Sequence, residues 1–185
     1  MRCATIEAMS QALREIGVGR ALKYCAGQFQ IALLKSELLL SPFRVILLKL
    51  FGMTIGKDSV IHACTFFNVY RGGFSKMRTG HHCFIGNECL IDLAETITLG
   101  NYVTIAERVS ILTHTSVGFS DHPLHGKIPA VMAGVRIGNG AFIGLGATIM
   151  PGVTIGENAI VGACSLVREN VTAGVTVAGI PARPV

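Results

Sequence analysis

The chain repeats a six-residue unit between Ile55 and Val171, in which an aliphatic residue comes first, Gly often follows, and a small residue takes the fifth position. A period of six is neither the roughly 3.6-residue period of an amphipathic helix nor the alternation of an isolated strand. If each unit is a short strand plus a corner, three units close a coil of about 18 residues. Aliphatic residues one coil apart then stack at about 4.8 Å. The period therefore predicts a parallel β-helix.

Three registers carry the repeat. The C-terminal register has six aliphatic residues without a slip, namely Ile137, Ile143, Ile149, Ile155, Val161 and Val167. The N-terminal register holds Ile55, Ile61, Phe67, Gly73, Thr79, Ile85, Ile91 and Ile97, and the register between them holds Leu99, Ile105, Ile111 and Val117. Two breaks separate them, a two-residue step from Ile97 to Leu99 and a 20-residue interval from Val117 to Ile137. A sandwich of ordinary strands does not explain these registers.

Small residues at the fifth position fit a narrow interior, and Gly at the second suits a corner that a Cβ would strain. The predicted interior small residues are Ala141, Ala147, Ala159, Ser165, Ser59, Thr65, Cys83 and Cys89. The six Cys form no CxxC pair, and four of them, Cys64, Cys83, Cys89 and Cys164, fall inside the repeat. We expect reduced core thiols in a cytoplasmic protein, and neither disulfides nor zinc ligands.

The composition limits the kinds of binding partner to be expected. A chain of 185 residues, half of them hydrophobic, fits a single domain with a substantial core. The net charge is +5, yet there is no Trp, only 6% aromatic residues and no cluster of Lys and Arg. A nucleic-acid partner is therefore not expected. An anionic small molecule or a bilayer surface suits the mild positive charge better.

Residues 1–54 differ from the rest. Apolar residues recur at helical spacing over residues 5–24, and a more apolar stretch, 28–51, is interrupted by charges and by Pro42. No window is free of charge for the length of a spanning helix, and no secretory signal is evident. Two roles stay open for these helices. They either cap the first coil, or they lie on a membrane through residues 38–51, with Arg44 and Lys49 at the headgroups.

The stretch from Ile55 to Val185 resembles the hexapeptide-repeat acyltransferases, closest to those that O-acetylate sugars and polysaccharides. The resemblance rests on the run from Ile143 to Val167 and on the ending Val177-Ala-Gly-Ile-Pro-Ala-Arg-Pro-Val185. It implies a mainly β fold, a left-handed parallel β-helix over 55–185 preceded by an N-terminal helical cap over 1–54. It also implies a homotrimer, with acetyl-CoA as acyl donor in the groove between neighbouring subunits and no metal.

The catalytic site is expected where the repeat is interrupted, in a loop at about 118–134, because long excursions from a rigid scaffold are often functional. Acyl transfer needs a base near neutrality, and imidazole provides one. His114, at the fourth place of a regular hexapeptide, is the first candidate. His122 is the second, because Asp121-His-Pro-Leu resembles the segment that carries the base in galactoside and maltose acetyltransferases. His125 is expected to be solvated.

Two carboxylates are candidates to receive the imidazole N–H, Asp92 and Asp121, the first because it lies near His114 one coil back. The resemblance also implies positions that contact coenzyme A. These are Gly144, Leu145, Gly162, Ala163, Arg168 and Arg183. In sugar acetyltransferases Ser usually stands at Leu145 and Thr-Lys at Arg168-Glu169, so side-chain contacts there differ. A guanidinium at Arg183 would pair well with phosphate.

Other functions stay open. Serine acetyltransferases and amino-sugar acetyltransferases share the scaffold, although the Asp-His pair of the former would fall on Asp92-Leu93. A γ-carbonic-anhydrase-like zinc protein would need His81, His82 and His114 as ligands. The third alternative is a non-catalytic trimeric scaffold.

The acceptor is expected to be a sugar or sugar-lipid in polysaccharide or lipopolysaccharide assembly, at the cytoplasmic face of the membrane. Fold does not determine substrate. Three cations, Arg71, Lys76 and Arg78, lie in the weakest part of the repeat. They either contact an anionic sugar carrier or form a solvated face.

Overall fold

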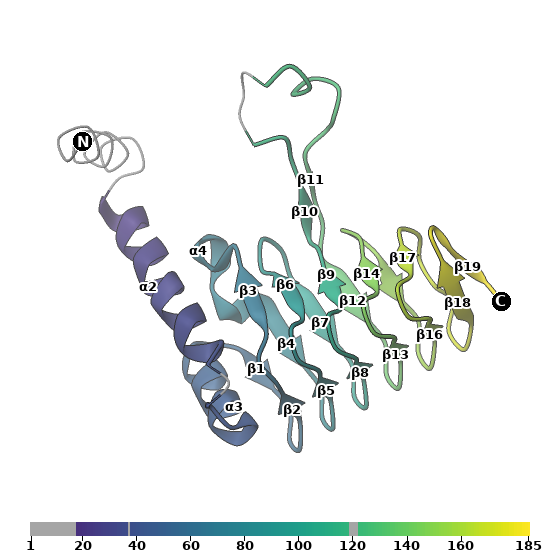
Figure 1. Cartoon of the computed structure of the whole chain (residues 1–185), viewed down its shortest axis with the longest axis horizontal. Helices are drawn as coiled ribbons and strands as arrows, with labels where there is room; N and C mark the ends of the chain where they lie inside the picture. Colours follow the sequence, from purple (N-terminus) through teal and green to yellow (C-terminus); the bar gives the residue numbers. More distant parts are fainter. Residues whose placement is uncertain (1–17, 37, 119–121) are drawn as a thin grey trace.

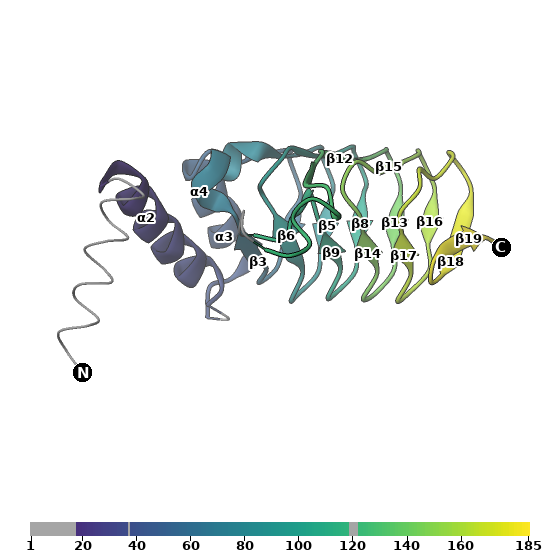
Figure 2. The same cartoon turned by 90° about the horizontal axis from the view of Figure 1, so that it is seen from above.

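The structure is a computed structural model that describes residues 18–36, 38–118 and 122–185. Three sheets form the walls of a coil, one antiparallel strand pair projects from it, and two helices lie at its N-terminal end (Figure 1). Seen from above, the coils follow one another along a single axis, with α2 and β19 at opposite ends (Figure 2). The six-residue period thus produces the coil predicted from it.

The coil has three walls, A, B and C. Wall A contains β1 (Thr54–Ile55), β4 (Met77–Thr79), β7 (Ile97–Leu99), β12 (Val135–Ile137) and β15 (Thr154–Ile155). Wall B contains β2 (Val60–Ile61), β5 (Phe84–Ile85), β8 (Thr104–Ile105), β13 (Phe142–Ile143), β16 (Ile160–Val161), β18 (Thr176–Gly179) and β19 (Ala182–Pro184). Wall C contains β3 (Thr65–Phe67), β6 (Leu90–Asp92), β9 (Ser110–Ile111), β14 (Thr148–Ile149) and β17 (Leu166–Val167). Among the described strands of the three walls, neighbours are parallel except for the last pair of wall B, β18 with β19.

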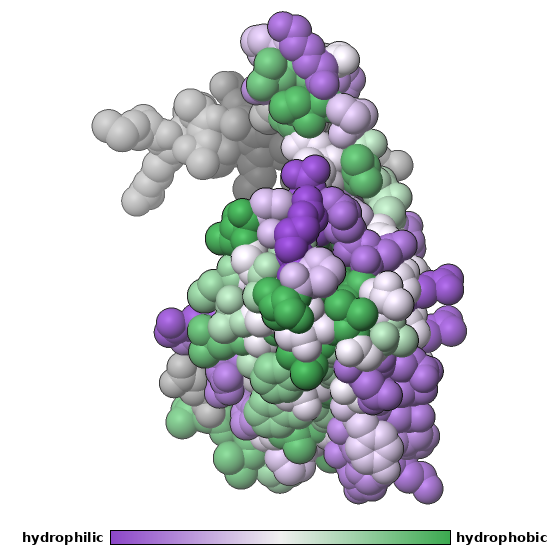
Figure 3. Space-filling model, turned by 90° about the vertical axis from the view of Figure 1, so that its right-hand side faces the viewer, coloured by the Kyte–Doolittle hydropathy of each residue, from purple (hydrophilic) through white to green (hydrophobic). Residues whose placement is uncertain are grey.

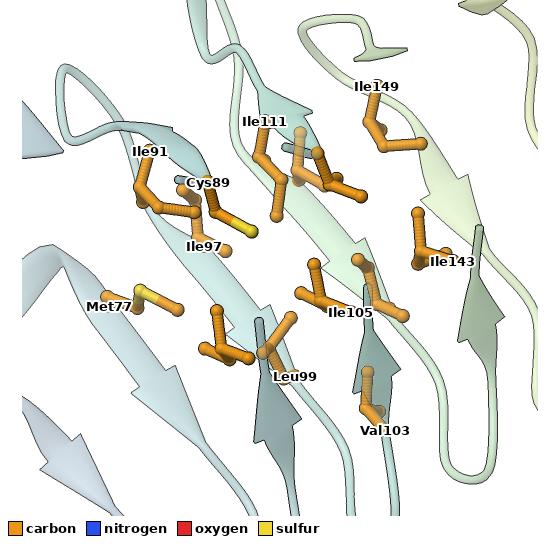
Figure 4. Packing of buried hydrophobic residues seen from close by; sticks show 14 of the residues in the cluster. Met77, Cys89, Ile91, Ile97, Leu99, Val103, Ile105, Ile111, Ile143 and Ile149 are labelled. Atoms are coloured by element: carbon orange, nitrogen blue, oxygen red, sulfur yellow. The ribbon is translucent and has the colours of Figure 1, made fainter. Parts of the chain in front are cut away.

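The core is a set of aliphatic ladders inside the coil (Figure 4). Ile91, Ile111 and Ile149 stack along wall C, and Ile105 pairs with Ile143 on wall B; all five are fully buried. Burial of one such side chain stabilises the folded state by about 1.5–3 kcal/mol. Each coil therefore covers the apolar interior of the next.

The corners explain the glycine of each repeat. A Cβ on Gly144 would lie 2.6 Å from the backbone nitrogen of Ala163 in the next coil, so close approach of backbones demands glycine there. The left-handed conformation occurs two positions later in the unit, for example at Tyr102 (φ 57°) and Arg108 (φ 59°). The corners are thus tight because successive coils touch.

Helices α2 (Val18–Leu34) and α3 (Ser41–Leu50) pack on the first coil. The helix expected over residues 5–24 lies partly outside the described residues. Pro42 stands in the first turn of α3, where a missing N–H is harmless, so it starts a helix and does not break one. None of the helices within the described residues is long and apolar enough to cross a bilayer.

The expected membrane role of Arg44 is wrong. Its side chain is only 3% exposed, and its guanidinium donates hydrogen bonds to the carbonyl oxygens of Leu34 (3.0 Å), Ser36 (2.9 Å) and Ile61 (3.4 Å). Arg44 therefore joins the end of α2 to the first coil, and it has no access to lipid headgroups.

The first coil departs from the predicted register. Phe66 points inward and is 2% exposed, whereas Phe67 is half-buried, because the corner after Ile61 is one residue shorter than the repeat predicts. Thr65 is half-buried for the same reason. The units predicted around Gly73 are replaced by α4 (Val69–Gly72) and the 3-10 helix η1 (Phe74–Lys76).

Three other interior assignments are wrong. Ser59 is half-buried, and its hydroxyl donates to the carbonyl oxygen of Gly80. Cys164 is exposed at a corner with φ 55°, and Val117 lies outside the coil. Cys64, Cys83 and Cys89 are buried in the core, in agreement with the predicted positions.

The 20-residue interval is an excursion from one corner. β10 (His114–Thr115) leads out of the coil and β11 (Val131–Met132) returns antiparallel to it, so that the pair stands away from the walls (Figure 1). Ile111 pairs with Ile149, 38 positions on, whereas Ile149 pairs with Val167 after only 18. The excursion therefore adds residues without disturbing the register of the walls.

Candidate functional site

Three polar residues from successive coils meet at the corner between walls C and A. Asn68 follows β3, Asp92 ends β6 and His114 begins β10. The Asp92 side chain is fully buried. Its Oδ1 accepts hydrogen bonds from Asn68 Nδ2 (2.7 Å) and the Ala94 amide (3.1 Å). Its Oδ2 accepts from the amides of Thr113 and His114, both at 3.0 Å.

The imidazole of His114 completes the set. Its Nδ1 lies 2.5 Å from Oδ2 of Asp92. Because an ionised carboxylate can only accept, the proton of this bond is on Nδ1, and Nε2 is left as the acceptor. The His114 side chain is 25% exposed, and its ring lies beside Phe67, with centroids 6.2 Å apart. One ring nitrogen is thus held by protein and the other is available.

The hydrogen bonds keep Asp92 ionised. Burial by itself would raise the pKa of Asp92, but the bonds from Asn68, His114 and the amides of Thr113 and Ala94 outweigh it. The pKa of Asp92 therefore lies below its usual value, and the carboxylate is charged at neutral pH. The buried carboxylate of Asp92 therefore orients the His114 ring through the bond to Nδ1.

Asn68 and Thr113 are site residues that the repeat pattern does not predict. The Thr113 hydroxyl donates to the backbone oxygen of Asp92 and accepts from the Glu95 amide, both at 3.0 Å, and it is buried. Asn68 has a left-handed conformation (φ 58°), which Asn tolerates better than most residues. The only signal for either was a polar residue beside an irregularity of the repeat.

A pocket of about 330 Å³ lies beside His114, between the excursion and α4. It is lined by Arg71, His114, Thr115, Ser116, Val117, Gly118, His125, Ile128, Ala130 and Met132. His125 therefore faces this pocket, although its side chain is exposed. His122 does not line it, and its Nδ1 accepts a hydrogen bond from the Leu124 amide at 3.1 Å. Asp121 lies outside the described residues.

Four of the positions expected to contact coenzyme A gather at another corner, between walls B and C. Gly144 and Gly162 stack there on successive coils, and the amide of Cys164 bonds to the carbonyl oxygen of Leu145 (2.8 Å). Leu145 and Ala163 are exposed. Arg168 instead follows β17, on the same side of wall C as His114. The structure therefore does not bring the glycine corner and His114 together within one chain.

Arg183 lies on β19 and is exposed. Its Nη1 is 3.2 Å from Oε1 of Glu169, so an anion there would compete with a carboxylate. His81 and His82 belong to the corner between walls A and B, where His81 Nδ1 accepts from the Lys57 amide and His82 stacks on Tyr102. Among the residues with described positions, no three His, Cys, Asp or Glu come together as metal ligands would.

Known proteins share both the repeat and the fold. The repeat family described as bacterial transferase hexapeptide (six repeats) matches residues 134–169. None of the curated proteins searched matches the chain. A hexapeptide-repeat-containing acetyltransferase from Vibrio cholerae is 27% identical, with a TM-score of 0.72 over 89% of both chains. The same Vibrio cholerae protein has been solved in complex with acetyl coenzyme A, at 27% identity and a TM-score of 0.71 over 89% of this chain and 86% of that one.

A galactoside acetyltransferase in complex with coenzyme A is 25% identical, with a TM-score of 0.74, over 96% of this chain and 89% of that one. A maltose O-acetyltransferase from Clostridium difficile, 22% identical over 91% and 87% with a TM-score of 0.69, shares the fold. These likenesses confirm the resemblance, the fold class and the enzyme class predicted from the sequence. The chain thus carries the bacterial transferase hexapeptide repeat over residues 134–169 and shares the β-helix fold of the acetyltransferases to which it is similar.

Proposed function

We propose that this protein transfers an acetyl group from acetyl-CoA to a hydroxyl group of a sugar, with His114 as the general base. The observation that carries the proposal is the hydrogen bond from His114 Nδ1 to buried Asp92 beside a pocket. It leaves Nε2 free to accept a proton from an acceptor in that pocket. A base held in one tautomer by a carboxylate is a recurring feature of acyl-transfer sites.

The reaction follows from this geometry. His114 Nε2 takes the proton of the acceptor hydroxyl as the oxygen forms a bond to the thioester carbonyl carbon. Asp92 stabilises the imidazolium that results, because it stays ionised. When the C–S bond breaks, His114 returns the proton to the leaving sulfur, so that the ester and free CoA are the products. Asn68 and Thr113 hold Asp92 and are positioning residues.

We propose the corner of Gly144, Leu145, Gly162 and Ala163 as the coenzyme A groove, with Arg168 and Arg183 toward its phosphates. Small residues there leave backbone groups accessible to an extended ligand, and guanidinium groups pair well with phosphate. The complexes of the Vibrio cholerae acetyltransferase and the galactoside acetyltransferase with acetyl-CoA and CoA support acetyl-CoA as the acyl donor.

A homotrimer would unite the two corners. The glycine corner and His114 lie on different edges of one coil, so a neighbouring copy has to bring its own groove to His114. Wall B presents exposed apolar side chains, including Val60 (38%), Phe142 (44%) and Ile160 (44%). Seen from the C-terminal end, hydrophobic side chains gather on one side of the molecule and hydrophilic ones on the other (Figure 3). Such a stripe is typical of an association surface.

We place this activity in polysaccharide or lipopolysaccharide assembly at the cytoplasmic face of the membrane. Residues 38–51 present Leu38 (94% exposed), Phe43, Ile46 and Leu50 to solvent, and Lys49 lies among them. These side chains support a peripheral contact with lipid that does not involve Arg44. Fractionation after a high-salt wash tests it, and complete release of the protein from membranes would contradict it.

The activity is tested by following CoA release from acetyl-CoA with a panel of sugars and amino sugars. We expect release that depends on a sugar hydroxyl and an O-acetyl product by mass spectrometry. An N-acetyl product would assign the amino-sugar alternative. Absence of release with every acceptor would leave the scaffold role. Stoichiometric zinc in the purified protein would favour the γ-carbonic-anhydrase-like alternative.

A further inference from the structure

The three cations of residues 67–79 have different surroundings in the structure. Lys76 forms an ion pair with Glu95 (3.1 Å). Arg78 lies on the outer face of wall A, in a shallow groove with Thr98 and Arg136. Only Arg71 lines the pocket that holds His114. Of these three cations, Arg71 is therefore the one placed to contact an acceptor bound at His114.

Neutral neighbours hold the guanidinium of Arg71. Its Nε donates to the Tyr70 hydroxyl (3.2 Å), its Cζ lies 5.7 Å from the centre of the Tyr70 ring, and its Nη1 is 3.6 Å from the sulfur of Met132. Within the described residues, no ion pair involves Arg71. The group is thus oriented, and no carboxylate of the described residues compensates its charge.

Arg71 also lies close to the reacting position. Met132, which Arg71 contacts, is the residue directly opposite His114 in the β10–β11 ladder. Residues opposite each other in an antiparallel pair have Cα atoms about 4.5–5.5 Å apart. An acceptor that reaches Nε2 of His114 with one hydroxyl can therefore reach Arg71 with a group on the same or the adjoining sugar ring.

The charges in the pocket indicate which kind of acceptor group Arg71 would bind. Its described polar lining consists of Arg71, His114, Thr115, Ser116 and His125, with no carboxylate among them. Asp92 lies behind His114 and is occupied by its own donors. A guanidinium with free donors at a partly closed site binds carboxylate or phosphate in a fork-like pair.

We propose that Arg71 binds an anionic group of the acceptor, so that the acceptor is an acidic sugar or a sugar phosphate. This proposal rests on the proposed acetyl transfer at His114. Binding of the anionic group to Arg71 does not itself require turnover. Arg71 is then a specificity-determining residue.

The test compares glucose, glucuronic acid and glucose 1-phosphate as acceptors for the wild type, Arg71→Gln, Arg71→Lys and Arg78→Gln. The Arg78→Gln control removes another exposed cation, outside the site. We expect the wild type to use at least one of the two anionic sugars better than glucose. In Arg71→Gln the KM for that sugar should rise about 10-fold to 100-fold, the range for losing a hydrogen-bonded charge. The KM for acetyl-CoA should stay unchanged, the loss with the anionic sugar should exceed any loss with glucose, and Arg71→Lys should recover part of it.

Equilibrium binding of the same three sugars, measured by calorimetry, separates this proposal from the proposed activity. Binding of an anionic sugar that depends on Arg71, without acetyl transfer, would support the anion site and refute the transferase. Equal binding or equal use of neutral and anionic sugars would overturn the role of Arg71, as would a loss in Arg78→Gln as large as that in Arg71→Gln. A preference for glucuronic acid or for glucose 1-phosphate decides between carboxylate and phosphate.

Discussion

Nδ1 of His114 and Oδ2 of Asp92 lie 2.5 Å apart, although 21 residues separate them in the chain and they belong to successive coils. The parallel ladder of wall C makes this possible, because Leu90 pairs with Ser110 and Ile91 with Ile111 directly before the two residues. The position of the imidazole is therefore determined by the same register that builds the core.

Replacement of His114 tests the base directly. His114→Ala should lower kcat about 10²-fold to 10⁴-fold, the usual contribution of a general base, with little change in the KM for acetyl-CoA. His122→Ala is the matched control, because His122 is exposed and does not line the pocket. CoA release under saturating acetyl-CoA measures both variants. Full turnover in His114→Ala, or an equal loss in His122→Ala, would reject the assignment.

Replacement of Asp92 tests the orientation of the ring. Asn has one acceptor oxygen where Asp92 receives hydrogen bonds from five donors, two of them on His114. Asp92→Asn should therefore lower kcat about 10-fold or more, part of what the base itself contributes. The pH profile should change as well, since the imidazolium loses its counterion. An unchanged pH profile with a lower kcat would indicate a structural role only.

The same carboxylate should affect stability at acid pH. Its pKa is lowered in the folded state, so its stabilising contribution is complete above the unfolded value, about 3.9. It is lost as the pH falls through the lower folded-state pKa. Urea unfolding at a series of pH values should show the wild type losing stability below pH ~4 more steeply than Asp92→Asn. Parallel curves for the two proteins would contradict the lowered pKa.

The glycine corner gives a prediction about stability. In Gly144→Ala the new Cβ would lie 2.6 Å from the Ala163 backbone nitrogen, so adjoining coils must separate. Overpacking of this kind typically lowers the free energy of unfolding by about 1–3 kcal/mol. Gly126→Ala is the control, since its Cβ would meet no atom within 4 Å. Thermal denaturation should show a lower Tm for Gly144→Ala alone, and equal values for both variants would refute the argument.

Arg44 supplies a further prediction. Arg44→Ala removes a donor from the carbonyl oxygens of Leu34, Ser36 and Ile61, of which Ser36 and Ile61 keep the Leu39 amide and the Ser41 hydroxyl. We expect a loss of about 2–4 kcal/mol in unfolding free energy, because buried hydrogen bonds and side-chain packing are lost together. Limited proteolysis should also cut faster between α2 and α3. Exposed Lys49 serves as the control, and a Lys49→Ala variant with the same behaviour would argue against a specific role for Arg44.

The period predicted the coil because each six-residue unit contains the residues that determine its own conformation. These are an aliphatic residue, the residues of the corner and a small residue. Where a corner changes length, the local rule fails: Phe66 replaced Phe67 inside the coil, and helix α4 replaced a predicted unit. Tertiary packing of α2 and α3 on the first coil decides those positions, and no single unit contains it.

The residues of the candidate site were likewise predictable only in part. His114 and Asp92 were named from the break in the repeat and from the distance of one coil along the chain. Asn68 and Thr113 were missed, because their contacts depend on the unusual first corner and on a buried hydroxyl. Arg71 could be assigned only after α4 was known, since a regular coil would not place it beside Met132.

The excursion leaves and re-enters the coil at one corner, and β9 still pairs with β14 across it. The segment from Ser116 to Ala130 is therefore interchangeable in principle. A loop of another length or composition, grafted between β10 and β11, would change what the pocket accepts. The anchor of the imidazole in the coil would stay where it is.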